Sequence, residues 1–136
     1  MTAGVPVVPD GQQQLYDAWH IAPAMRAGDL ILCSGVLGRS ADGSIPDDLD
    51  AQFEAAFAAL SNVLAAAGAS LNDIVELVTF HTHLESDLEV FHAVKDRHIG
   101  APYPAWTAVE VTALGAGTAP GARVEIKATA YHCLPH

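Results

Sequence analysis

The pattern of hydrophobic and polar positions is most regular in residues 103–130, where two runs with a period of two flank a Gly/Ala/Pro-rich loop. Such alternation is typical of half-buried strands, so we predict two neighbouring strands. Trp106, Ala108 and Glu110 share one face of the first strand, because successive side chains point to opposite faces. In the second strand, Glu125 points away from the apolar positions. The pattern therefore predicts a sheet that positions one large aromatic side chain and one carboxylate.

Two amphipathic helices are predicted upstream of these strands. Apolar residues recur at helical spacing over residues 49–67, Asp47 or Asp48 can cap the start of the helix, and Gly68 is a natural C-terminal stop. A second helix is expected to begin with Ser86 or Asp87 as its cap and to continue to about His98. The apolar stripe of each helix indicates packing against a sheet.

Shorter patterns predict the remaining strands. A short strand near Val7 lies in an otherwise loose N-terminal arm, residues 1–13, which is rich in Pro, Gly and Gln. Residues 14–20 and 30–34 are further predicted strands, and residues 73–84 form a strand rich in β-branched side chains. This order of elements predicts an α+β fold, in which both helices pack on one face of a mixed β-sheet.

The length and composition are those of a single globular domain spanning residues 1–136. The apolar fraction of 51% against 16% charged residues excludes disorder. Six basic and sixteen acidic residues give a formal net charge of −10. Because nucleic-acid binders need a basic footprint that neutralises phosphates, we expect no nucleic-acid partner.

Sequence features of membrane and secreted proteins are not visible. No apolar run approaches the roughly 20 residues of a membrane helix, and no basic segment followed by an apolar stretch marks a secretory signal. Cys33 and Cys133 are unlike a disulfide framework, and Cys33 lies in an apolar run. We therefore expect a cytoplasmic protein without a membrane partner.

His81 and His83 raise the question of a metal site. Residues i and i+2 of a strand point the same way, so both imidazoles can reach one ion, with His92, His98 or His132 as a third ligand. The alternative is a pair of polar positions near a strand end, which we favour because no Asp or Cys at ligand-like spacing accompanies them. The sequence also lacks a phosphate-binding glycine loop, a Cys-x-x-Cys pair and a nucleophile elbow. We expect neither a metal nor a cofactor.

Glu125 is the candidate for acid–base chemistry. A carboxyl between apolar neighbours can have its pKa raised toward neutral pH and can exchange protons with water. The alternative is an outward-facing glutamate on a half-exposed strand, and spacing alone favours this alternative. Trp106 by itself is likewise more typical of a core or an interface than of a ligand platform.

Several separated motifs resemble the RidA/YjgF family. Residues 22–35, Ala-Pro-Ala-Met-Arg-Ala-Gly-Asp-Leu-Ile-Leu-Cys-Ser-Gly, are similar to the SPAVRAGDLIFVSG pattern of that family. Residues 104–111, Pro-Ala-Trp-Thr-Ala-Val-Glu-Val, are similar to its PARTAVEV signature, and residues 124–130 to its VEIEAIA strand. Together with the helix end at residues 63–70, the motifs follow the family's order over residues 20–131.

The resemblance implies a chorismate-mutase-like α+β fold that assembles as a homotrimer with pockets between subunits. Family members hydrolyse reactive enamines and imines to ammonia and a keto acid without a cofactor. In that reaction an arginine binds the substrate carboxylate and a glutamate activates water. By resemblance, Glu125 is the catalytic glutamate, and Gly35, Thr107 and Ala108 line the pocket.

The sequence departs from the family pattern at four positions. Trp106 stands where the family has its carboxylate-binding arginine, and an indole offers one N–H donor and a π-face in place of a cationic fork. Ile21 replaces a tyrosine, His92 an asparagine and Lys127 a second glutamate. Trp106, Ile21 and His92 join the predicted substrate-binding residues. Because a substrate carboxylate loses its bidentate partner, we expect the usual activity to be lost.

Two functions are consistent with these residues. The first is hydrolytic deamination, by Glu125, of a small reactive enamine or imine that is conjugated or derived from an aromatic compound and stacks on Trp106. The alternative is a non-catalytic trimer that binds a small ligand or a partner. The endoribonuclease label often attached to the family conflicts with the net charge of −10.

Overall fold

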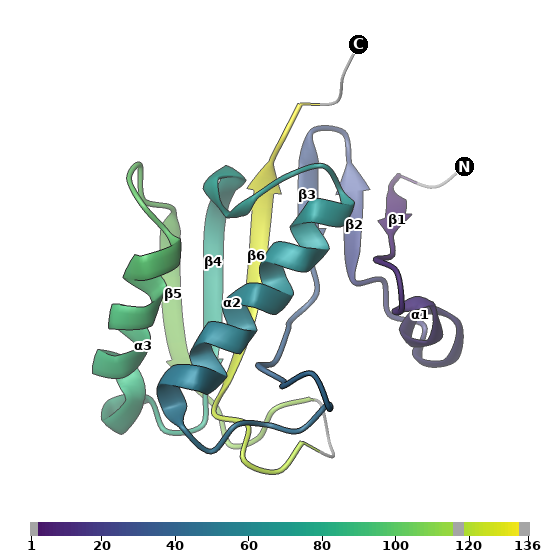
Figure 1. The fold of residues 1–136 in the computed structure, drawn as a ribbon. Coiled ribbons are helices and arrows are strands. Elements are labelled where there is room, and N and C mark those ends of the chain that lie inside the picture. Colours follow the sequence, from purple (N-terminus) through teal and green to yellow (C-terminus); the bar gives the residue numbers. More distant parts are fainter. Residues whose placement is uncertain (1–2, 116–118, 134–136) are drawn as a thin grey trace.

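A computed structural model describes residues 3–115 and 119–133, and within them the chain forms one six-stranded sheet. Helices α2 and α3 cover the same face of this sheet, whereas α1 lies beside its β1–β2 end (Figure 1). This is the predicted α+β architecture. The strands are β1 (Val5–Val7), β2 (Ala24–Ala27), β3 (Leu30–Cys33), β4 (Ile74–His81), β5 (Ala105–Glu110) and β6 (Val124–Tyr131). The helices are α1 (Gln13–Trp19), α2 (Leu49–Ala66) and α3 (Leu84–His98), with a 3₁₀ turn at Leu71–Asp73.

The order of strands across the sheet is β1-β2-β3-β6-β4-β5. The prediction that the two C-terminal strands are neighbours is wrong, because β4 lies between them. Helix α3 connects β4 to β5, and such a crossover places β5 parallel to β4 on the outer edge of the sheet. The inner position goes to β6, whose alternate residues from Val124 to Ala130 are buried. Residues 116–118 of the predicted hairpin loop lie outside the described residues.

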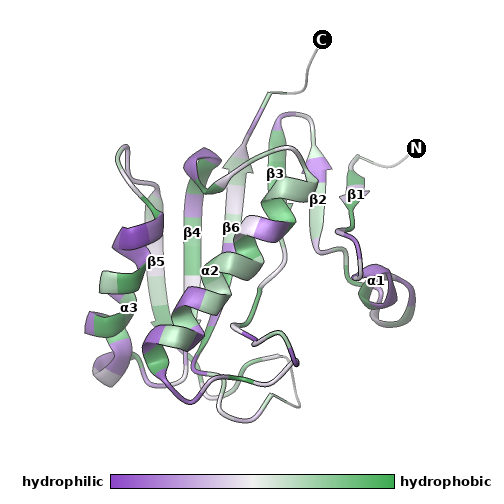
Figure 2. Cartoon of the chain, viewed as in Figure 1, coloured by the Kyte–Doolittle hydropathy of each residue, from purple (hydrophilic) through white to green (hydrophobic). Residues whose placement is uncertain are grey.

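The core lies between the sheet and α2. Asp48 caps this helix as predicted, since its carboxylate accepts a hydrogen bond of 2.9 Å from the Ala51 backbone N–H. Hydrophobic residues line β3 and β4, whereas hydrophilic residues mark both ends of α3 (Figure 2). The large apolar side chains of α2 that point to the sheet are fully buried: Phe53, Phe57, Leu60 and Leu64.

Residues 14–20, predicted as a strand, instead form most of α1. The apolar residues Leu15, Tyr16 and Trp19 fit a helical spacing as well as a strand spacing over so short a stretch. A hydrogen bond of 3.0 Å from Gln13 to Asp17, four residues on, lies along one side of the helix. The helix buries none of its residues, so local preferences rather than core packing select its conformation.

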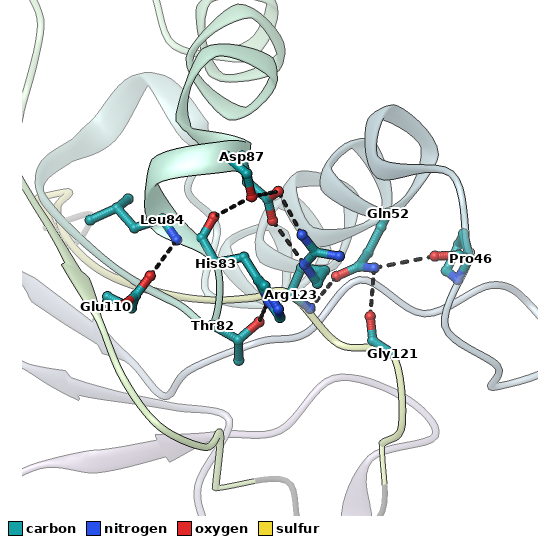
Figure 3. Close-up of polar contacts among 10 residues, drawn as sticks. Pro46, Gln52, Thr82, His83, Leu84, Asp87, Glu110, Gly121 and Arg123 are labelled. Atoms are coloured by element: carbon teal, nitrogen blue, oxygen red, sulfur yellow. Dashed lines mark hydrogen bonds and ion pairs between the residues drawn. The ribbon is translucent and has the colours of Figure 1, made fainter.

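Helix α3 begins at Leu84, earlier than its predicted caps Ser86 and Asp87. Glu110 at the end of β5 performs the capping, because its carboxylate accepts the Leu84 backbone N–H at 2.9 Å. Asp87 is buried and binds Arg123 through two hydrogen bonds of 2.8 and 3.0 Å (Figure 3). The true cap is distant in sequence, which explains why local spacing misplaces the start.

Candidate functional site

A cavity of about 270 Å³ lies where α1, the segment after β3 and the start of β6 meet. A pair of backbone hydrogen bonds of 2.9 and 3.0 Å between Val36 and Ile126 fixes that segment beside β6. The wall of the cavity is mostly apolar, and Glu125 lines it together with a serine and an arginine. The lining residues that matter for its chemistry are Leu15, Ile21, Ser34, Gly35, Arg39 and Glu125.

Gly35 lies directly against the Glu125 side chain. A methyl group at residue 35 would overlap the Glu125 carboxyl and its Cγ, so only glycine leaves the space that this side chain fills. The φ angle of Gly35 is not in the left-handed region, so close approach and not backbone conformation requires the glycine. This contact explains the Ser-Gly motif at the end of β3 in physical terms.

The Glu125 carboxyl is half-buried on the sheet face that α2 and α3 do not cover. Desolvation by burial raises its pKa above the ordinary value of 4.5. Among the described residues, no hydrogen bond or ion pair reaches this carboxyl. It is therefore available to a ligand or a water molecule in the cavity, with a pKa shifted in the direction that suits a general base.

Trp106 lies on the opposite face of the sheet, under α3. Its ring is 6.0 Å from the ring of Phe91 and stacks at 6.0 Å on His92, and the Lys95 ammonium nitrogen lies 4.6 Å from its centre. Its indole N–H donates to the Thr79 hydroxyl at 3.0 Å. Side chains of α3 thus already contact the ring, and Thr79 of β4 accepts the indole N–H.

Thr107 and Ala108 follow Trp106 along the edge strand β5. Thr107 is exposed on the uncovered face, and Ala108 points to the helix side. Neither lines the cavity around Glu125. Within one chain, the structure brings together Ile21, Gly35 and Glu125 of the predicted site residues, and it separates them from Trp106, Thr107, Ala108 and His92.

His81 and His83 do not point to a common ion. The His81 ring is fully buried under α3, with Nε2 at 2.8 Å from the Thr79 hydroxyl and Nδ1 without a partner. Burial lowers the pKa of His81, so the neutral imidazole is favoured. His83 is exposed at the start of α3. Within residues 3–115 and 119–133, no group of three or more His, Cys, Asp and Glu residues is arranged to bind a metal.

Comparison with known proteins supports the motif resemblance. The family model described as Endoribonuclease L-PSP matches residues 12–132. The RutC family protein YjgH of Escherichia coli K12 is 41% identical over 107 residues, which cover 78% of this chain and 82% of YjgH. The chain belongs to the RidA/YjgF family. The endoribonuclease description is the name of the family model and not an observation on this chain.

Solved structures of other RidA/YjgF proteins share the fold. The structure of YjgH superposes with a TM-score of 0.84 at 36% identity, covering 98% of this chain and all of that one. A YjgF/YER057c/UK114 family member from Mycobacterium tuberculosis gives 0.77 at 33% identity over 92% and 97% of the two chains. RidA from the Antarctic bacterium Psychrobacter gives 0.76 at 29% identity over 96% and 99%. The fold of this chain is thus that of RidA/YjgF proteins.

Sequence reasoning missed Arg39 and Ser34 as residues of the site in this RidA/YjgF chain. Ser34 directly precedes the glycine that contacts Glu125, and its hydroxyl donates to the Ala22 carbonyl at 2.7 Å. Arg39 lies in a turn-rich stretch with no helical or strand period, so no pattern indicates the direction of its side chain.

A separate finding concerns membranes: no helix in the described part of the chain is long and apolar enough to cross one.

Proposed function

We propose that this RidA/YjgF protein hydrolyses a small reactive enamine or imine and that Glu125 is its general base. The observation that supports the proposal most directly is the half-buried Glu125 carboxyl, with a raised pKa and no protein partner among the described residues, in a cavity of about 270 Å³. Family membership supports the same class of reaction. Pockets for drug-sized ligands measure roughly 300–1,000 Å³, so a substrate here is small.

The proposed reaction needs only water and proton transfers. Glu125 removes a proton from a water molecule while the water oxygen attacks the carbon of the C=N bond. The resulting amino alcohol then takes a proton on nitrogen, the C–N bond breaks, and ammonia leaves as the hydroxyl becomes a carbonyl. An enamine enters the same route after protonation on carbon. A carboxyl with a raised pKa suits both proton removal and proton return.

The contacts of Trp106 favour a packing role over the predicted stacking on a substrate. Phe91, His92 and Lys95 already contact its ring, and Thr79 accepts its N–H. Within the proposal, a conjugated or aromatic-derived substrate instead contacts the apolar wall beside Leu15 and Ile21. Trp106 then shapes the outer strand β5 and does not bind the substrate directly.

We further propose the homotrimer that family membership implies, with pockets between subunits. The sheet face without helices has exposed apolar side chains, including Leu30, Leu32 and Val109. Contact with a second copy removes this apolar surface from water. The same contact is a route by which Thr107 on the edge strand of one copy reaches the Glu125 cavity of another.

Glu125→Gln tests the proposed base. Imines are generated in situ by an amino-acid oxidase or an amine oxidase, and the release of ammonia is measured above the spontaneous rate. We expect the catalysed rate to fall by about 10²- to 10⁴-fold, the usual contribution of a positioned general base. Glu76→Gln is the matched control, because Glu76 is an exposed glutamate on β4 that does not line the cavity. An unchanged rate in Glu125→Gln would exclude Glu125 as the base.

A trimer that binds a small ligand without catalysis is the second candidate. The observation in its favour is Trp106 at the family's arginine position, with its ring turned toward α3. Binding of a small ligand to the Glu125 cavity without turnover of any imine would support this alternative. Cleavage of RNA is disfavoured by the net charge of −10, which repels a polyanion.

A further inference from the structure

Helix α1 turns one of its sides toward the Glu125 cavity. The helix buries none of its residues completely. Of the described residues 11–20, only Gln12 and Leu15 are half-buried, and both line the cavity. Residues three apart lie on the same side of a helix. The side of α1 that is partly withdrawn from water is therefore the side at the cavity.

Leu15 is half-buried without being part of the core. The half-buried apolar side chains that pack against the core of the described chain do not include Leu15 or Ile21, although both line the cavity. Their apolar surface is thus available to a ligand in the cavity. Contact with an apolar group of that ligand removes this surface from water, which is favourable.

The turn after α1 brings Ile21 beside Leu15. His20 adopts a left-handed conformation with a φ angle of 57°, which is costly for a residue other than glycine. The Ile21 backbone N–H donates to the Leu15 carbonyl at 3.4 Å. Two residues on, the Pro23 carbonyl accepts the Ser34 backbone N–H at 3.0 Å. These contacts hold the C-terminal end of α1 against the segment that follows β3.

The cavity combines this apolar wall with the Glu125 carboxyl in a small volume. Its volume of about 270 Å³ is below the roughly 300 Å³ at which pockets for drug-sized ligands begin. A substrate that presents its C=N carbon to a water molecule at Glu125 has little space for the rest of its atoms. A substituent on that carbon therefore has to be compact and has to contact the walls.

We propose that Leu15 determines which imines this protein accepts, because its side chain contacts the substituent on the C=N carbon and limits the size of that substituent. This inference rests on the function proposed above and adds the substrate class. The class is imines whose substituent is a compact uncharged hydrocarbon group, up to the size of a single ring. A charged substituent is disfavoured because it loses its hydration against the apolar wall.

Two aromatic imines that differ in ring size test the role of Leu15. An amino-acid oxidase generates them in situ from phenylalanine, which has one ring, and from tryptophan, which has two fused rings. In Leu15→Ala we expect kcat/KM to fall about tenfold for the phenylalanine-derived imine and to rise about tenfold for the tryptophan-derived imine. Tenfold is the lower end of the discrimination that one methylene group gives in a hydrophobic pocket. A general loss of folding lowers both values and cannot produce opposite changes.

Two further variants control for other effects on α1. Leu15→Met nearly conserves the volume of the side chain and should keep the wild-type preference. Tyr16→Ala removes a large side chain from the next position, which is exposed and does not line the cavity. It should also leave the preference unchanged. A parallel fall for both imines in Leu15→Ala, or the same change of preference in Tyr16→Ala, would overturn the proposal.

Binding of the stable products separates this inference from the proposed reaction. Calorimetry with the 2-oxo acids of phenylalanine and tryptophan needs no turnover, and the two acids have the same charge. In Leu15→Ala, weaker binding of the smaller acid and tighter binding of the larger one would support Leu15 even if Glu125→Gln left the rate unchanged. In that case only the proposed base would fail. Unchanged binding of both acids in Leu15→Ala, or no binding of either acid to the wild type, would overturn the role of Leu15.

Discussion

The contact between Gly35 and Glu125 sets the chemistry of the site at the scale of single residues. Because Gly35, which follows β3, has no side chain, the Glu125 carboxyl of the neighbouring strand β6 can occupy a partly desolvated position in the cavity. Burial then raises the pKa of Glu125 above its ordinary value of 4.5. The position of the Glu125 carboxyl and its raised pKa thus have one physical cause, which is the absence of a side chain at residue 35.

The raised pKa predicts the pH dependence of the rate. A general base acts in its ionised form, so kcat/KM should fall as the pH drops through the pKa of Glu125. Because burial shifts that pKa upward, the midpoint of the acid limb should lie above pH 4.5. A pH profile of imine hydrolysis measures the midpoint. A limb centred below pH 4.5, or the same limb in Glu125→Gln, would contradict the assignment.

Gly35→Ala should damage the site more than the fold. The added methyl group overlaps the Glu125 side chain, which must move out of the cavity. We expect kcat/KM to fall by about 10- to 100-fold, since a misplacement of about 1 Å can cost 10²-fold. The free energy of unfolding should change by less than about 1 kcal/mol, because Glu125 is a flexible side chain beside solvent.

Gly100→Ala is the matched control for that substitution. A methyl group at residue 100 meets no heavy atom within 4 Å, so both activity and stability should stay near wild type. Steady-state kinetics and denaturant unfolding of the two variants give the comparison. If Gly35→Ala retained full activity, the crowding of Glu125 would not matter for the reaction.

At the scale of elements, the start of α3 is attached to the sheet by long-range polar contacts. Asp87 is 1% exposed and accepts two hydrogen bonds from the Arg123 guanidinium next to β6. Glu110 caps the same helix from β5. Gln52 of α2 accepts the Arg123 backbone N–H at 2.7 Å and donates to the carbonyls of Pro46 and Gly121, all visible in Figure 3. These contacts connect both helices to one end of the sheet.

Arg123→Ala should be strongly destabilising, because it leaves the Asp87 carboxylate buried without its partner. We expect the free energy of unfolding to fall by about 2–4 kcal/mol, somewhat less than for a fully buried pair because Arg123 keeps some solvent access. Urea unfolding measures the change. Arg97→Ala is the control, since its ion pairs with Asp50 and Glu54 are exposed and should matter less. Equal losses in both variants would contradict the role given to burial.

Sequence patterns predicted those elements whose own residues determine their packing. The fully buried stripe of α2 and its Asp48 cap follow from local spacing. The start of α3 does not, because Glu110 and Arg123 bind it from distant strands. The short α1 was mispredicted because its few apolar residues fit two periods and none is buried.

The same limit applies to the site. The motifs assign Glu125, Gly35 and Trp106 to one site; Glu125 and Gly35 lie in contact, whereas Trp106 lies on the other face of the sheet. The period of two correctly assigns Trp106 and Glu125 each to one face of its own strand. Whether those two faces lie on the same side of the sheet depends on the register between strands, and here Trp106 is opposite Leu77 while Glu125 is opposite Phe80. Single-strand periodicity contains no such information.

At the scale of the whole molecule, one sheet face is covered by helices and the other is open. Leu30 and Leu32 are each 40% exposed on the open face, and Val109 is 37% exposed. The Glu125 cavity borders the same side of the sheet. The proposed trimer would therefore cover apolar surface and complete the site in a single step.

Leu32→Glu should disrupt that assembly. A carboxylate in the centre of the open face would be desolvated by a second copy, which is unfavourable without a partner charge. We expect the mass measured by analytical ultracentrifugation to fall from three chains toward one, with a parallel loss of imine hydrolysis. Leu88→Glu places the same charge on an exposed leucine of α3 and should leave the mass unchanged. Monomeric wild type would contradict the proposed trimer.

The central place of β6 in the sheet has a consequence for biosynthesis. In the described part of the chain, every other strand and helix precedes β6 in sequence, yet β6 lies between β3 and β4 in the sheet. A nascent chain that has emerged only as far as α3 and β5 thus has two separate sheet fragments, each with an unpaired edge. Since unpaired edges invite association with other chains, the polypeptide stays exposed to such contacts until residues 124–131 leave the ribosome. The six-stranded sheet is consequently expected to form only after β6 has been synthesised.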